Sequence, residues 1–243
     1  MNQRIELVGK SVGAALLIAL GDFALLKLGN PIGPVIFAFG LLGVCYLGQN
    51  LFTGKCGFLI EDKIKWRDLL TILIVNLIAG YLIGVVFSLI DTQVATSAIE
   101  KAATWDTSMR FFIKSILCGV IMYIAVLMYR KGTPLGIIFG VPLFIFCGFQ
   151  HCIANVITMG AAQTFSWSIL ICVAGNFVGS LLMWLIARSL PEKKGGLLVG
   201  EMVKITEKSD GATERGPKVA EKSAKVIEKS DNRGGKNAKS RKK

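Results

Sequence analysis

A single histidine and a threonine stand in two polar interruptions of otherwise apolar sequence, and both could do chemistry there. His151 is the only histidine of the chain and follows the apolar stretch 135–148. Its imidazole could exchange a proton near neutral pH or donate a hydrogen bond, because its unperturbed pKa is about 6.5. Thr53 lies in the other interruption, 49–55, where its hydroxyl could orient a bound molecule or the imidazole. A structural histidine satisfied by backbone carbonyl groups is the alternative interpretation.

The composition predicts that these residues are held in a membrane. Hydrophobic residues make up 53% of the 243 residues and charged residues only 18%, whereas soluble domains carry about 25% charged residues. The charge is uneven, because residues 192–243 hold 15 of the 28 Lys and Arg but 8 of the 16 Asp and Glu. We therefore predict a transmembrane channel domain over 1–191 and a basic, mostly disordered cytoplasmic tail over 192–243. The tail could attract anionic membrane lipid or a cytoplasmic partner, or could simply be solvated.

Six apolar stretches are long enough to cross the hydrocarbon core as helices, which takes about 20 residues. They cover residues 9–28, 32–60, 69–90, 110–129, 134–161 and 165–189. Lys and Arg gather before the first stretch, between the second and third, between the fourth and fifth, and after the sixth. By the positive-inside rule, both termini of this multi-pass protein are expected in the cytoplasm, with the protein in the cell membrane. The segment between the third and fourth stretches is expected to be an outer loop.

The second and fifth stretches are both interrupted by polar residues at membrane depth. Backbone outside a helix is tolerated there only where protein or a wet cavity satisfies it, so we expect both interruptions to be functional. Each is the middle stretch of a group of three, which is the pattern of an inverted 3+3 repeat. The helices after the breaks, starting near Thr53 and Ala154, would then point their positive N-termini at an anion between them.

Several classes of function are disfavoured by the residues that the chain carries. One histidine, few carboxylates inside the apolar stretches and no GxxxxGK[ST] loop argue against an enzyme, a cofactor and an ATP-driven pump. The six cysteines show no CxxC spacing, and with one histidine we expect no metal site. The basic excess lies in loops and mostly in the tail, so nucleic acid is not expected as a partner.

Three short segments resemble motifs of the formate/nitrite transporter family. Residues 149–155, FQHCIAN, resemble its GFEHxxAN segment, and residues 51–54, LFTG, match its LFTG segment. Residues 175–179, GNFVG, resemble the GN-x-x-G pattern of its last helix. The resemblance covers about residues 1–190. It implies an all-α membrane protein of aquaporin-like fold, with six transmembrane helices of which the second and fifth are broken.

The resemblance also implies a homopentamer whose protomers each hold a pore for small monovalent anions such as formate, nitrite or hydrosulfide, sometimes moved with a proton. His151 and Thr53 would meet the substrate, beside Gln150 and Asn155. The constriction would be formed by Phe37, Leu41 and Phe144, with Leu51 and Phe52 in the loop nearby. Asn176 and Asn155 would tie the broken backbone together.

Two roles for His151 in such a pore stay open. The imidazole would hold the anion by a hydrogen bond, or would hand it a proton. Protonation would turn the anion into a neutral acid that crosses an apolar gate more cheaply. Apolar constrictions also exclude hydrated ions by dewetting.

Some residues depart from the family pattern. Gln150 replaces the usual glutamate, Lys55 stands where a small polar residue is commoner, and Gly119 follows Cys118 where many members have an asparagine. Lys55 would enrich anions electrostatically. Two further charges lie inside apolar stretches: Lys114 is expected to snorkel to the interface, and Asp22 is not placed by the sequence.

The alternative function is an aquaporin-like pore for small neutral solutes. Such a pore normally carries Asn-Pro-Ala at both breaks, where this chain has LFTG and CIAN.

Overall fold

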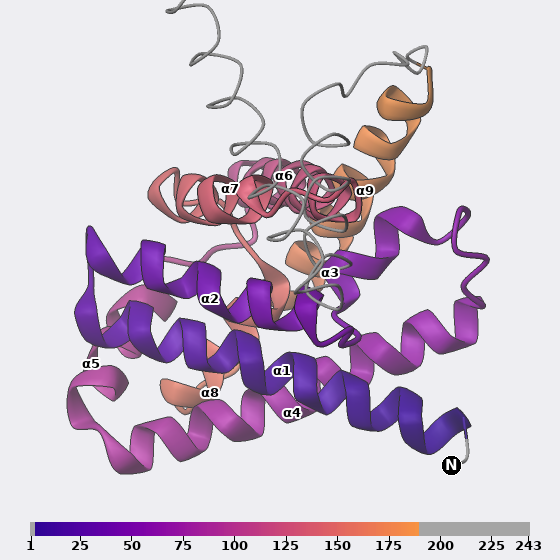
Figure 1. Ribbon diagram of the computed structural model, residues 1–243. Coiled ribbons are helices and arrows are strands. Elements are labelled where there is room, and N and C mark those ends of the chain that lie inside the picture. Colours follow the sequence, from indigo (N-terminus) through magenta and orange to yellow (C-terminus); the bar gives the residue numbers. More distant parts are fainter. Residues whose placement is uncertain (1–2, 190–243) are drawn as a thin grey trace, which may run out of the picture. The chain divides into compact units, whose positions relative to one another are not determined.

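The computed structural model describes residues 3–189, and within this range every regular element is a helix (Figure 1). The helices are α1 (Gln3–Leu28), α2 (Ile32–Tyr46), α3 (Phe52–Lys55), the 3-10 helix η1 (Cys56–Phe58), α4 (Trp66–Ile90), α5 (Thr92–Ala102), α6 (Met109–Arg130), α7 (Leu135–Phe146), α8 (Cys152–Ala161) and α9 (Ser168–Ser189). The tail predicted over 192–243 lies outside the described residues.

Four of these helices, α1, α4, α6 and α9, are long and apolar enough to cross a membrane. They coincide with four of the predicted stretches, although α1 already begins at Gln3. Large apolar side chains stand exposed along them, for example Leu16, Ile74, Leu117 and Leu185. A helix that is apolar on its outer as well as its inner face is typical of a membrane span.

The segment expected to be an outer loop contains the helix α5. Asp91 begins it, because its carboxylate accepts a hydrogen bond from the amide of Val94 at 3.1 Å. Val94 and Ala98, one turn apart, are buried, so α5 has one apolar face. This face packs α5 against α8, α1 and α4. The interpretation as a loop was wrong. An amphipathic helix is less apolar on average than the membrane spans around it, so a search for long apolar stretches does not find it.

The long helices form two groups, and each group receives a short helix from the other (Figure 1). α1 packs against α2 and α4, while α6 packs against α7 and α9. α8 follows α7 in the chain but packs against α4. Likewise, α3 and η1 follow α2 but contact α6 and α9. Because the two segments cross over, the residues just before α3 and α8 are held between the two groups.

The helices α2 and α7 end in the same way, each at a glycine. Gly48 has a φ of 60° and Gly148 a φ of 66°, a left-handed backbone that glycine adopts without strain. In both, the amide that follows the glycine donates to a carbonyl in the last turn of the helix, 2.9 Å away. This is the usual glycine cap of a helix C-terminus, so the two apolar stretches are each divided into separate helices.

Helix resumes at Phe52 and at Cys152, close to the expected starts. α8 then runs to Ala161, whereas α3 ends at Lys55 and passes into the 3-10 turn η1. Gly54 lies in α3 and Gly57 in η1, and each glycine lowers the stability of a helix by about 1 kcal/mol relative to alanine. The helix that follows the first break is therefore short.

Candidate functional site

The backbone between α2 and α3 is fastened by Asn76, a fully buried residue of α4. Its Oδ1 accepts a hydrogen bond from the amide of Phe52 at 2.9 Å. Its Nδ2 donates to the carbonyl oxygens of Ser11 at 2.8 Å and Asn50 at 3.1 Å. One side chain thus satisfies backbone groups that lipid could not satisfy.

The backbone between α7 and α8 is fastened in the same way by Asn176 of α9, which is also fully buried. Its Oδ1 accepts from the amide of Cys152 at 2.8 Å, and its Nδ2 donates to the carbonyl oxygens of Ser115 and Gln150, both at 2.8 Å. The predicted role of Asn176 fits this position. Asn76 was missed, although a lone amide inside an apolar span was a signal that could have found it.

The two breaks meet through the side chains of Thr53 and His151. The Oγ1 of Thr53 lies 2.9 Å from the Nε2 of His151, although the residues are 98 positions apart. Both side chains are buried, at 2% exposed. Thr53 is the second residue of α3, and His151 immediately precedes α8. The two residues that the sequence picked out separately therefore form one polar contact.

The other ring nitrogen of His151, Nδ1, determines which atom is the donor in the hydrogen bond between Nε2 and the hydroxyl of Thr53. Nδ1 accepts a hydrogen bond from the amide of Ala154 at 3.1 Å, so His151 caps the N-terminus of α8. A nitrogen that accepts carries no proton, so the proton of a neutral imidazole must be on Nε2. Nε2 then donates to Thr53, and the hydroxyl proton of Thr53 is free to point elsewhere.

Aromatic and aliphatic side chains surround this contact. The ring of Phe144 stacks on the imidazole of His151, with centroids 5.8 Å apart and planes at 22°. The ring of Phe37 meets Phe144 edge to face at 6.1 Å. Leu41 and Leu51 are likewise buried, at 1% exposed. Phe37 and Phe144 line one cavity and Leu41 and Leu51 line a second, and the two cavities share no lining residue.

The first cavity, called here the α5 cavity, has a volume of about 190 Å³. His151, Phe37 and Phe144 line it, and so does Lys101 of α5. Lys101 was not among the predicted site residues, because its segment was taken for a loop. It brings a cation into the cavity that the imidazole also lines.

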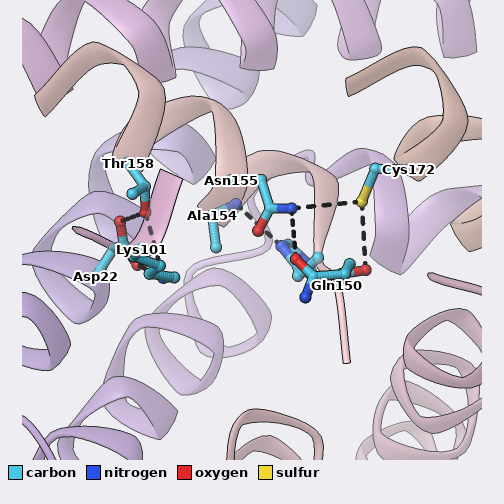
Figure 2. Close-up of polar contacts among 8 residues, drawn as sticks. Asp22, Lys101, Gln150, Ala154, Asn155, Thr158 and Cys172 are labelled. Carbon is cyan, nitrogen blue, oxygen red and sulfur yellow. Dashed lines mark hydrogen bonds and ion pairs between the residues drawn. The ribbon is translucent and has the colours of Figure 1, made fainter. Parts of the chain in front are cut away.

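Gln150 and Asn155 also line the α5 cavity. Figure 2 shows the hydrogen bond between their side chains. The Nδ2 of Asn155 donates to the Oε1 of Gln150 at 2.9 Å, and the Nε2 of Gln150 donates to the carbonyl of Gly148 at 2.9 Å. The thiol of Cys172 donates to the backbone carbonyl of Gln150 at 3.3 Å. The two amides therefore hold the break together and offer the cavity a neutral wall.

The second cavity, called here the Lys55 cavity, has a volume of about 110 Å³ and is lined by Leu41, Leu51, Lys55 and Arg130 among others. Arg130 makes two hydrogen bonds to Asp62, at 2.9 and 2.5 Å. These bonds hold the pKa of the Asp62 carboxyl below its usual value. Among residues 3–189, no ion pair is made by Lys55. Lys55 thus lines this cavity without a direct ion pair to any described residue.

One predicted constriction residue lies elsewhere, because Phe52 is buried at the start of α3 and lines neither cavity. Lys114, which was expected to snorkel to the interface, is half-buried on α6.

The chain has relatives among known protein families and transport proteins. The sequence model of the formate/nitrite transporter family matches residues 7–186. The uncharacterized transporter YwcJ of Bacillus subtilis (strain 168) is 28% identical in an alignment over 190 residues that covers 65% of this chain and 73% of YwcJ. The formate channel FocA of Haemophilus influenzae is 27% identical in an alignment over 145 residues that covers 51% of each protein.

Two solved structures have a similar fold. One, described as an FNT family ion channel, has a TM-score of 0.66 at 21% identity and covers 78% of this chain and 92% of its own. The other, a pentameric formate channel with formate bound, has a TM-score of 0.55 at 18% identity and covers 84% and 97%.

The apolar helices and the family match together define a multi-pass membrane transport protein rather than an enzyme. The chain belongs to the formate/nitrite transporter family. The alternative of an aquaporin-like pore for neutral solutes is not favoured by this membership.

Proposed function

We propose that this protein conducts small monovalent anions of the formate, nitrite or hydrosulfide type between the α5 cavity and the Lys55 cavity. The path would pass the contact between Thr53 and His151. That contact carries the proposal, because it is a buried polar pair at the meeting of the two breaks, with an apolar layer and a cavity on either side. The similarity to the formate channel FocA and to a pentameric formate channel supports the substrate class.

The membrane arrangement is part of the proposal. α2 with α3 and η1, and α7 with α8, would be two broken spans that bring the total to six, in an inverted 3+3 repeat. The matching hydrogen bonds of Asn76 and Asn176 support the repeat. By the positive-inside rule, both termini would lie in the cytoplasm. The similarity to a pentameric channel supports a homopentamer with one pore in each protomer.

In this path His151 would act as a hydrogen-bond donor. An anion that enters the apolar layer loses water, and this loss must be compensated. The Nε2–H of His151 would donate its hydrogen bond to the anion instead of to Thr53. The hydroxyl of Thr53 would donate a hydrogen bond to the anion as well. The amide of Ala154, at the positive end of α8, polarises the ring through Nδ1.

The hydrogen bond at Nδ1 favours one of the two roles of His151, which are hydrogen-bond donation to the anion and proton transfer to it. A second proton on the ring would have to sit on Nδ1, where the amide of Ala154 already points its hydrogen. Donation by a neutral imidazole therefore fits the site better than transfer of a proton from an imidazolium. A proton that accompanies the anion would then come from water.

The remaining residues have supporting roles in the proposal. Phe37 and Phe144 on one side and Leu41 and Leu51 on the other would exclude hydrated ions by dewetting. Lys55 would raise the local concentration of anions at its cavity. Gln150 and Asn155 would line the path.

Flux measurements in proteoliposomes test the proposal. The purified protein should equilibrate at least one of formate, nitrite and hydrosulfide, measured side by side, and His151→Ala and Thr53→Ala should reduce that flux. Thr71→Ala is the matched control, because the hydroxyl of Thr71 bonds only within its own helix, to Arg67, at the surface. Wild-type vesicles that pass none of the three anions, or variants that keep every flux, would refute the proposal.

A further inference from the structure

Asp22 is a carboxylate with no exposed surface in the last third of α1 (Figure 2). Its Oδ2 accepts a hydrogen bond from the hydroxyl of Thr158 at 2.8 Å. Its Oδ1 accepts from the Nζ of Lys101 at 3.3 Å, and the same Nζ lies 3.2 Å from the Oγ1 of Thr158. Three helices, α1, α5 and α8, thus each contribute one residue to this cluster, called here the Asp22 cluster.

A charged group inside a membrane span is costly and is retained where it has a task or a partner. Thr158 could satisfy the carboxylate by hydrogen bonding alone, but only Lys101 compensates its charge. The interaction is also unequal, because the carboxylate is fully buried while the side chain of Lys101 is 31% exposed. The ammonium therefore faces two environments, the buried carboxylate and the α5 cavity.

Lys101 is the one charged side chain among the described residues that line the α5 cavity, and His151 lines the same cavity. An anion in the cavity therefore meets this ammonium as one half of a neutral pair with Asp22. A free ammonium in a partly dry cavity would hold the anion strongly. Conduction requires a site weak enough to release the ion onward.

We propose that Asp22 attenuates the hold of Lys101 on permeating anions, so that the α5 cavity captures an anion without trapping it. This inference rests on the proposed anion path and adds a residue that never touches the anion. Asp22 is thus a positioning and charge-compensating residue that acts through Lys101, and Thr158 holds its carboxylate in place.

The test is formate flux in proteoliposomes as a function of formate concentration, for wild type, Asp22→Asn, Lys101→Gln and the double variant. Asp22→Asn should lower both the half-saturation concentration and the maximal flux by about fivefold, because the ammonium of Lys101 then attracts the anion without its counter-charge. Lys101→Gln should raise the half-saturation concentration. In the Lys101→Gln background, Asp22→Asn should change neither quantity by more than about twofold, because contacting residues that act through one another are not additive.

Controls separate this role from a structural one. Glu100→Gln removes a carboxylate from an exposed position next to Lys101 on α5 and should leave both quantities unchanged. Each variant is compared with wild type by size-exclusion chromatography, and Asp22→Ser replaces Asp22→Asn if the latter does not assemble.

Each result decides the question. An unchanged half-saturation concentration in Asp22→Asn, or a raised one as in Lys101→Gln, overturns the inference, as does an equal effect of Asp22→Asn with and without Lys101. These results presuppose wild-type flux, so its absence would refute the proposed function instead.

Discussion

Asn76 and Asn176 make matching sets of three hydrogen bonds on the two breaks of the chain. Each Oδ1 accepts the first helical amide after a break, 24 residues earlier in both cases. Each Nδ2 donates to the carbonyl 26 residues earlier, at the end of the break, and to a serine carbonyl of α1 or α6. The same device thus holds both breaks, and it orients the backbone on which Thr53 and His151 stand.

Removal of either amide should destabilise the protein strongly. Asn76→Leu and Asn176→Leu each leave the buried amide of the first helical residue after a break without its acceptor, and each removes a donor from two backbone carbonyl groups. An unsatisfied buried group costs about 1–3 kcal/mol, so we expect a loss of roughly 2–5 kcal/mol for each variant. Thermal unfolding in detergent, followed by loss of the native size-exclusion peak, measures it. Gln93→Ala removes an exposed amide that bonds to Lys27 and should change little; equal melting of all three would contradict the prediction.

The hydroxyl of Thr53 should matter for flux and not for the fold. Thr53→Val keeps the shape but removes the acceptor of the His151 Nε2 proton, worth about 0.5–1.5 kcal/mol, so we expect roughly two- to tenfold less anion flux. Thr53→Ser restores the hydroxyl and should recover most of the flux. Proteoliposome flux at matched protein content is the measurement, and a valine variant as active as the serine variant would argue against a role of the hydroxyl.

Gly119 should tolerate no side chain. A methyl group added there would collide with the backbone of Asn176, including its carbonyl oxygen, because α6 and α9 pack closely at this point. Overpacking of this kind costs about 1–3 kcal/mol or more. Gly119→Ala should therefore lower the unfolding temperature, whereas an added methyl at Gly9, where nothing lies within 4 Å, should not. Circular dichroism melts of Gly119→Ala and Gly9→Ala make the comparison.

The ion pair of Asp62 and Arg130 should stabilise the protein except at strongly acid pH. Because Arg130 holds the pKa of Asp62 low, the stabilisation is complete above the unfolded pKa of about 3.9 and disappears as the pH falls through the lower folded value. Both side chains are about one-third exposed, so the pair is worth only about 0.5 kcal/mol.

We therefore expect Asp62→Asn to lower the unfolding temperature by about 1–2 °C at pH 7. The difference from wild type should shrink at pH 2–3 and in high salt, because salt screens exposed charges. A difference that grows on acidification would contradict the assignment.

Much of the site was readable from the sequence because its signals are local. Polar residues inside apolar stretches pointed to Thr53 and His151, and the family motifs pointed to the same places. The glycines that end α2 and α7 stand beside those polar residues. Asn176 was found because it lies in a family motif, whereas Asn76 lies in an ordinary apolar helix with no motif around it.

The Asp22 cluster could not be predicted in this way. Asp22, Lys101 and Thr158 lie on three helices that are distant in sequence, and α5 had been expected to be a loop. Lys101 alone looks like a solvated loop residue, and Asp22 alone has no evident partner. The three residues meet only because α8 packs against α4, α5 and α1 rather than against α7, which it follows in the chain.

The sequence by itself determined the membrane class, the apolar spans, the two glycine-ended helices and the presence of one imidazole among polar breaks, because hydropathy and helix termination depend on neighbouring residues. Only the tertiary structure decided that Thr53 and His151 meet, that Nδ1 is occupied by the amide of Ala154, and that Asp22 is buried against Lys101. These relations are set by helix packing between distant parts of the chain, where distances of a few ångströms decide which donor finds which acceptor.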